Sequence, residues 1–153
     1  MEEDFEKVRK KAEEFYKSIS AVYCPYFKER IVLNALGFEH IKLKSWKRPR
    51  LKEDQYMRLK LLKYIPQILE NSKTVQGISQ LKEFVRQKKY GRWEAVLTNV
   101  YYYEFIAVLD NKRIKIVIKQ IEDGEKFFWT IIPYWKKGKF NNRKLFEGNP
   151  ETD

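Results

Sequence analysis

The residues of this chain that could do chemistry begin with its single histidine. His40 lies in the segment 37–50, GFEHIKLKSWKRPR, which contains one acid, Glu39. The basic residues of the segment are Lys42, Lys44, Lys47, Arg48 and Arg50. Histidine suits proton transfer because its unperturbed pKa of about 6.5 lies near neutral pH, and arginine offers phosphate a fixed, two-pronged donor. The segment is therefore either a site that handles phosphates or a solvated basic turn.

Two predicted strands late in the chain supply further candidates. Residues 113–121, RIKIVIKQI, alternate so that isoleucines fill one face and Arg113, Lys115 and Lys119 share the other. In the next predicted strand, 126–135, the same alternation puts Trp129 and Thr130 on opposite faces. Thr130 is the polar residue of an otherwise apolar strand. It is either a β-favouring residue bonded to the backbone or a hydroxyl that donates to a phosphate.

This set of groups fits RNA cleavage without a metal ion. The 2′-hydroxyl attacks its own phosphate, so an enzyme must accept that proton, protonate the leaving oxygen and hold the developing charge with cations. Arg58, in the helix predicted after the segment, adds another cation. The alternative for His40 is an ordinary half-buried helix residue. Each of Lys42, Lys44 and Lys47 is by itself expected to be a solvated surface charge, and together they are expected to steer phosphates.

Composition narrows the classes of protein. The chain has 153 residues and a net charge of +11, which favours a polyanionic partner, with nucleic acid first and then an anionic membrane or an acidic protein. One cysteine and one histidine cannot form a structural zinc site, and the dinucleotide, P-loop and zinc-protease motifs are missing. We therefore expect no cofactor and no metal. The lone cysteine and the lack of long apolar runs predict a cytoplasmic protein without a membrane span.

The elements that must position these residues form two halves. Helical spacing of apolar residues predicts helices over 2–20 and 53–71, the second kinked before Pro66, and Asn34 caps a short helix between them. A short strand is predicted at 31–33 and a basic loop at 45–51. The later strands are predicted at 74–78, 81–87, 93–98, 101–109, 113–121 and 126–135.

These elements predict an α+β fold, in which N-terminal helices pack on a C-terminal antiparallel sheet of four or more strands. Tight turns at 110–111 and 122–125 make the last strands neighbours. We expect one domain over residues 1–136. Residues 137–153 are predicted to form a basic tail that is ordered only in part.

The order of several short motifs resembles a known family. They are VYCP from Val22, GFEH ending at His40, RPR at 48–50, RLKLL from Arg58, RIKIVIK from Arg113 and FFWTIIP from Phe127. Together they span about Val22 to Pro133. This arrangement resembles the phage-associated, toxin-like members of the barnase, EndoU, colicin and RelE-like nuclease superfamily. The resemblance implies a four-stranded sheet whose concave face binds RNA, and metal-independent endoribonuclease activity.

The resemblance assigns the catalytic roles to four positions. His40 corresponds to the general acid or base, Arg50 or Arg48 to the basic residue after it, Lys119 to the basic residue of the penultimate strand, and Thr130 to the hydroxyl. The family often has Arg where this chain has Lys119, and Ser where it has Thr130. Lysine keeps the charge but loses the bidentate grip on phosphate.

The leading hypothesis is an endoribonuclease in which Arg50 and Lys119 clamp phosphate and Arg48 assists. The residues expected to bind nucleic acid around this set are Lys42, Lys44, Lys47, Arg48, Arg58, Arg113 and Lys115. Many relatives are toxins, so the resemblance also suggests an acidic antitoxin or immunity protein as a partner. The alternatives are a non-catalytic module that binds RNA or DNA through the same basic face, and an interaction protein that binds an acidic protein or lipid.

Overall fold

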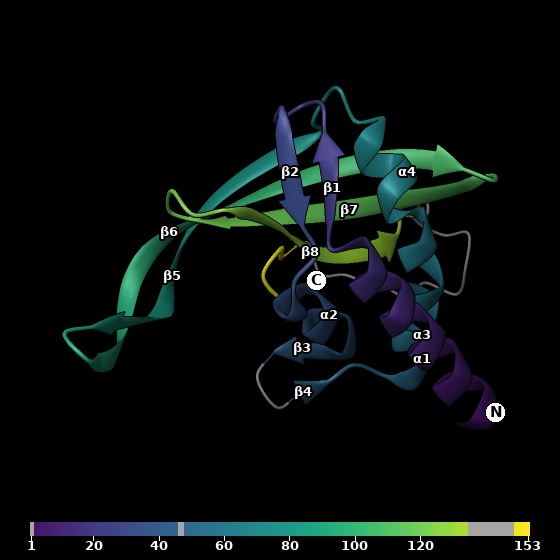
Figure 1. Ribbon diagram of the computed structural model, residues 1–153, viewed down its shortest axis with the longest axis horizontal. Coiled ribbons are helices and arrows are strands. Elements are labelled where there is room, and N and C mark those ends of the chain that lie inside the picture. Colours follow the sequence, from purple (N-terminus) through teal and green to yellow (C-terminus); the bar gives the residue numbers. More distant parts are fainter. Residues whose placement is uncertain (1, 46–47, 135–148) are drawn as a thin grey trace.

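The computed structural model describes residues 2–45, 48–134 and 149–153, and it has an α+β architecture (Figure 1). Its helices are α1 (Glu2–Ile19), α2 (Ala35–Lys42), α3 (Lys52–Leu61) and α4 (Ile65–Glu70), with a 3₁₀ turn at Leu62–Tyr64. Its strands are β1 (Ala21–Cys24), β2 (Glu29–Val32), β3 (Leu43–Ser45), β4 (Arg48–Pro49), β5 (Gly77–Lys89), β6 (Arg92–Leu109), β7 (Lys112–Ile121) and β8 (Lys126–Pro133).

The main sheet has the strand order β1-β2-β8-β7-β6-β5. All its neighbours are antiparallel except β2 and β8, which run parallel and pair at Val32 and Phe127. The predicted arrangement of N-terminal helices on a mostly antiparallel C-terminal sheet is confirmed. The isoleucines of β7, at positions 114, 116 and 118, point into the main core with the helices, as their alternation predicts.

The sheet differs from the prediction in the length of two strands. Residues 77–89 form one strand and residues 92–109 another, where four shorter strands were predicted. The predicted breaks are absent because the two strands pair continuously from Gly77 with Glu104 to Lys89 with Arg92. The reversal falls at Tyr90 and Gly91, whose φ angles of 52° and 78° lie in the left-handed region that a tight hairpin requires.

The predicted basic loop at 45–51 also differs, because part of it pairs with the end of the preceding segment. β3 and β4 form a separate two-stranded sheet, with Leu43 opposite Pro49 and Ser45 opposite Arg48. The two short strands hold the chain between α2 and α3 in a defined path. Arg50 is thereby brought back against α2, where its main-chain N–H donates to the carbonyl of Lys42.

The helices form where the sequence predicts them. Asn34 caps α2, and its side chain accepts a hydrogen bond from the N–H of Gly37 at 3.1 Å. At the predicted kink before Pro66, a 3₁₀ turn at Leu62–Tyr64 interrupts the α-helical hydrogen bonding between α3 and α4. In α1, Tyr16 is buried and donates to the carbonyl of Asn34 at 2.6 Å, whereas its neighbour Phe15 is exposed.

Gly37 brings α2 close to the sheet. A Cβ atom at this position would overlap the carbonyl oxygen of Phe128 and would lie 2.8 Å from both the Phe128 ring and the Tyr16 hydroxyl. Sequence reasoning treats this glycine as a weakness of the helix. In the structure its missing side chain allows α2 to approach β8, and that approach places His40 over the sheet.

The predicted tail is described only at its end. Residues 137–148 lie outside the described part of the chain. The prediction that the tail is ordered only in part therefore concerns residues outside the described ranges. Residues 149–153 pack against the body of the protein, and Asp153 is buried. They contact the residues that the sequence singles out for chemistry.

Candidate functional site

The candidate site lies along the part of β8 whose outer edge pairs with no strand of the described chain. Because β2 pairs with β8 only at Phe127, the following residues of β8 have α2 and α3 beside them. Val117 lies opposite Thr130 and Ile118 opposite Phe128, so Trp129 is an extra residue in a β-bulge. The prediction that Trp129 and Thr130 lie on opposite faces is therefore wrong, because the bulge turns both toward the face of Lys119.

His40 is buried between Trp129 and Arg50. Its ring stacks on the Trp129 indole, with 3.9 Å between ring centroids and 15° between ring planes. Arg50 Nη2 lies 3.0 Å from His40 Nε2, and Arg50 Nε donates to the His40 carbonyl at 2.9 Å. Because arginine carries only donors, Nε2 accepts this bond, and the imidazole is the neutral form with its proton on Nδ1.

The electrostatic surroundings of His40 keep it neutral. Burial, together with the charges of Arg50, Arg58 and Lys119, lowers the pKa of His40 to about 2. In this arrangement the neutral imidazole lacks the second proton that it could give to a leaving group, and the lone pair on Nε2 already accepts a hydrogen bond from Arg50. His40 therefore acts here as the acceptor that holds the Arg50 guanidinium in place.

Arg58 lies beneath the site and is fully buried. Its Nε donates to Asp54 at 2.7 Å and its Nη1 donates to Thr130 Oγ1 at 2.7 Å. Asp54 also lies 3.7 Å from Arg50 Nη1, so one carboxylate serves both guanidinium groups. From the sequence, Arg58 is expected to contact nucleic acid. The structure places it behind Thr130, where its charge acts on the site from within.

Residues 149–153 supply oxygen acceptors to these donors. Arg50 Nη2 donates to the main-chain oxygens of Thr152 at 3.0 Å and Asp153 at 2.9 Å, so its two N–H groups are shared among these oxygens and His40 Nε2. Arg58 Nη1 donates to the same Asp153 oxygen. Trp129 Nε1 donates to the carbonyl of Pro150 at 2.9 Å. Two arginines thus converge on two oxygen atoms of one segment.

Thr130 belongs to the same cluster. Its hydroxyl lies 3.4 Å from the Asp153 oxygen, which Arg50 and Arg58 also contact. Thr130 is therefore linked to Arg50 through the Asp153 oxygen that both side chains contact, and Arg50 in turn contacts His40.

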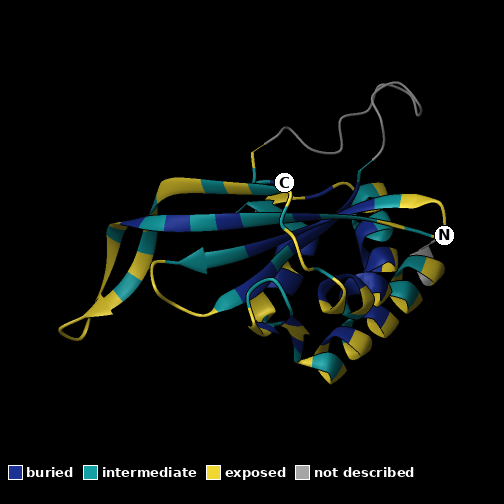
Figure 2. Cartoon of the chain, turned by 90° about the horizontal axis from the view of Figure 1, so that it is seen from above, coloured by how far each residue is buried: buried dark blue, intermediate teal, exposed yellow. Residues whose placement is uncertain are grey.

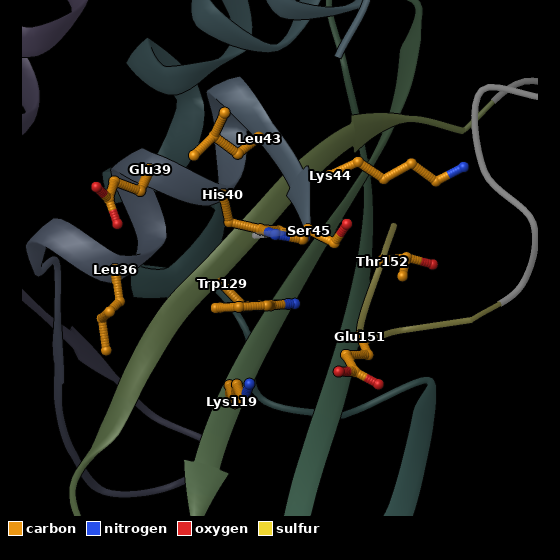
Figure 3. Close-up of a pocket in the computed structure, with 10 residues that line it drawn as sticks. All are labelled: Leu36, Glu39, His40, Leu43, Lys44, Ser45, Lys119, Trp129, Glu151 and Thr152. Carbon is orange, nitrogen blue, oxygen red and sulfur yellow. The ribbon is translucent and has the colours of Figure 1, made fainter. Parts of the chain in front are cut away.

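Lys119 lies on the other side of Trp129. Figure 3 shows His40, Trp129 and Lys119 in three layers, and the ammonium of Lys119 lies 3.9 Å from the centre of the indole. Lys119 Nζ is also 3.8 Å from Glu83, which accepts hydrogen bonds from the Tyr102 hydroxyl at 2.8 and 3.0 Å. Burial lowers the pKa of Lys119 and raises that of Glu151, which lies against Glu83. Lys119 thus belongs to a second group of charges behind the indole.

A pocket of about 270 Å³ opens beside this stack (Figure 3). Its lining includes His40, Lys44, Lys119, Trp129 and Glu151. The pocket therefore reaches both the imidazole and the ammonium that the sequence analysis selected. Glu151 and Thr152 form one wall, so residues 149–153 also bound this pocket.

The other predicted cations lie outside the central cluster. Arg48 is exposed on β4 and Lys42 lies over the Phe38 ring, while Lys47 falls outside the described residues. Arg113 is half-buried toward the start of β7. Lys115 is buried and paired with Glu104 at 3.0 Å. The structure therefore brings together His40, Arg50, Thr130 and Arg58, with Lys119 across the indole.

Sequence reasoning missed the residues that connect this cluster. Trp129 contacts His40, Lys119 and Pro150, but its position within an apolar strand predicts a core residue. Glu83, which pairs with Lys119, lies in a distant strand, whereas Asp54 lies four residues from both Arg50 and Arg58. Only the spacing of Asp54 and Arg58, four residues apart on a predicted helix, was a signal that could have been used.

Within the described ranges, no group of three or more His, Cys, Asp or Glu side chains is placed to hold a metal ion. No helix of the described chain is long and apolar enough to cross a membrane. Comparisons with protein-family models, with curated proteins and with solved structures found no match.

Proposed function

We propose that the protein is an endoribonuclease that cleaves RNA by acid-base catalysis without a metal ion. The observation that carries the proposal is the convergence of Arg50 and Arg58 on the main-chain oxygens of Thr152 and Asp153. Charged donors that hold two neighbouring oxygens suit the non-bridging oxygens of a phosphate. The Thr130 hydroxyl beside them adds a further donor.

Each residue of the cluster has a role in this proposal. Arg50 clamps the scissile phosphate, Arg58 supports it from below, and Thr130 donates to a phosphoryl oxygen. Lys119, across the indole, holds a neighbouring part of the RNA in the pocket. His40 transfers a proton once Arg50 has turned toward the phosphate, because only then is its Nε2 lone pair free.

The alternative is a module that binds RNA or DNA through the same residues and cleaves nothing. It is favoured by the state of His40, whose lowered pKa of about 2 and occupied Nε2 leave no proton to give at neutral pH. In that case His40 only orients Arg50. The cations and the pocket would then serve for binding alone.

The two functions are separated by an RNA cleavage assay in EDTA. We expect the wild-type protein to cut a labelled single-stranded RNA, and Thr130→Val to reduce the rate by about 100-fold to 1,000-fold, since it removes one donor to the transition state. Thr130→Ser keeps the hydroxyl and should retain most of the rate. His40→Asn should lose about 100-fold to 10,000-fold if the imidazole transfers a proton.

The matched control is Arg30→Gln, which removes an exposed cation of β2 and should leave the rate nearly unchanged. Melting temperatures of all variants show whether each one folds. A wild-type protein that binds RNA but never cuts it would establish the binding module instead. If it neither binds nor cuts RNA, both functions fail.

A further inference from the structure

The hairpin of β5 and β6 extends beyond the rest of the sheet. β6 pairs with β7 only from Val100 onward, so residues 82–89 have residues 92–99 as their strand partners, and we call these two segments the arm. Only Asn99, at the base of the arm, also bonds Glu122 beyond β7 among the contacts of the described backbone. At about 3.4 Å per residue the arm is roughly 25 Å long. Figure 1 shows it curling away from the helices, and Figure 2 shows that exposed residues concentrate toward its tip.

One face of the arm combines aromatic rings with cations. The register places three pairs on this face, Phe84 with Leu97, Arg86 with Ala95, and Lys88 with Trp93. We call it the aromatic face; Lys82 and Asn99 complete it. Phe84 is 74% exposed and Trp93 is 62% exposed. Two large rings therefore stand in solvent on either side of a guanidinium group.

The charges of the aromatic face all have one sign. Lys82, Arg86 and Lys88 are exposed, and the face carries no acid. The opposite face differs, because it holds both acids of the arm, Glu83 and Glu94, and Val85 packs there against the sheet. The opposite face also holds Lys89 and Arg92, so its charges are mixed. The aromatic face carries cations without acids, together with both exposed rings, on the side that no described part of the chain covers.

We propose that the aromatic face binds single-stranded RNA, with Trp93 and Phe84 stacking on bases and Arg86, Lys82 and Lys88 contacting phosphates. Binding of single strands without sequence preference uses this combination of a cationic track and aromatic platforms. A single strand fits better than a duplex, because the base faces of a duplex are stacked on one another and cannot reach the rings. That the nucleic acid is RNA rests on the proposed function.

A second copy of the chain is a poorer occupant of this face. In a two-fold symmetric dimer the same patch would meet itself, so three cations would face three cations with no acid between them. An RNA strand instead supplies one negative charge per nucleotide opposite the same cations. The sign of the charge therefore favours the nucleic acid.

Binding is tested with a single-stranded DNA oligonucleotide of about 15 nucleotides, a length that matches common single-strand sites. It lacks the 2′-hydroxyl that the proposed cleavage needs, so fluorescence anisotropy reports affinity alone. We expect Trp93→Ala to weaken binding by about 5-fold to 150-fold, the usual effect of removing one stacking ring. Tyr23→Ala, which removes a 50% exposed ring of β1, is the matched control and should change little.

The phosphate contacts are tested through salt. Arg86→Gln should reduce the slope of log affinity against log salt by about 0.7, the value for one phosphate contact to a single strand, whereas Arg30→Gln should leave the slope unchanged. A duplex of the same sequence should bind the wild-type protein less tightly than the single strand and should show less dependence on Trp93.

Failure of this inference differs from failure of the proposed function. The inference is overturned if Trp93→Ala and Phe84→Ala bind the oligonucleotide as tightly as the wild-type protein. It is also overturned if these variants lose only self-association, measured by light scattering, because the face would then be a protein interface. Cleavage of a dinucleotide by the wild-type protein tests the candidate site separately, because the substrate has too few bases to stack on both rings of the arm while it occupies the site. If the wild-type protein leaves the dinucleotide intact while the arm variants weaken binding, the nuclease fails and the arm site stands.

Discussion

Removal of residues 149–153 should open the candidate site and strengthen RNA binding. These residues place two main-chain oxygens where the proposal puts phosphoryl oxygens, and both oxygens are held by Arg50. RNA and the segment therefore compete for the same donors. A chain that ends at residue 148 no longer has that competitor, so a larger fraction of molecules is ready to bind.

The size of the effect follows from the contacts that are lost. Three bonds from guanidinium groups, two from Arg50 and one from Arg58, contribute about 1.5 to 3 kcal/mol each. The bond from Trp129 to Pro150 adds about 1 kcal/mol. Ordering five residues costs roughly 1 to 2 kcal/mol per residue, so the gain and the cost nearly cancel. Closed and open arrangements of equal free energy give a gain in affinity of about two-fold on deletion, and a closed arrangement favoured by about 1 kcal/mol gives a gain of about six-fold.

The assay is anisotropy with the same single-stranded oligonucleotide at several salt concentrations. The deletion also removes Glu151 and Asp153, and two fewer negative charges would by themselves raise affinity for a polyanion. The control is therefore the double variant Asp4→Asn and Glu14→Gln, which makes the same charge change on the exposed surface of α1. Deletion that strengthens binding no more than this control, or weakens it, would refute the competition.

Two further predictions concern the packing of α2. Between about pH 7 and pH 5.5 the wild-type protein should lose about 1 kcal/mol of stability relative to His40→Asn. The pKa of His40 is about 2 in the folded chain and about 6.5 in the unfolded chain. As the pH falls, the unfolded chain therefore takes up the proton first and is stabilised relative to the folded chain. Equal pH dependence in urea unfolding would contradict this. Gly37→Ala should lower the free energy of unfolding by about 1 to 3 kcal/mol, since its Cβ would lie 2.8 Å from the Phe128 ring and the Tyr16 hydroxyl. Thermal unfolding measures the loss, and Glu39→Ala, at an exposed position of the same helix, is the control.

Much of the fold could be predicted because its elements are encoded by local patterns. The stripe of α1, the Asn34 cap and the alternation of β7 each depend on residues that are close in sequence. The turn at Asp110 and Asn111 likewise needs the left-handed backbone, with φ angles of 50° and 61°, which these residue types tolerate. These local patterns predict structure well because the residue types that favour a helix, strand or turn are the same residues that form it.

The site was harder to predict because its geometry depends on contacts between distant parts of the chain. Alternation correctly describes β7 but fails in β8, where one extra residue turns Trp129 onto the face of Lys119 and Thr130. A bulge has no simple signature in an apolar strand. The position of Arg58 was also wrongly predicted. A cation in a basic chain is read as a surface residue, whereas here Asp54 and Thr130 satisfy it in full burial.

The bulge and the histidine together indicate how the site would change between a closed and an open state. With residues 149–153 in place, Trp129 is held by His40 on one side and by the Pro150 carbonyl at its edge, and Arg50 bonds both the imidazole and the segment. Release of the segment would free donors of Arg50 and the indole N–H at once and would admit water to the imidazole. Because desolvation is the largest cause of the low His40 pKa, that pKa would rise toward its ordinary range. Access of the phosphate and activation of His40 would then be the same event, so a protein closed by its own residues would carry an inactive base.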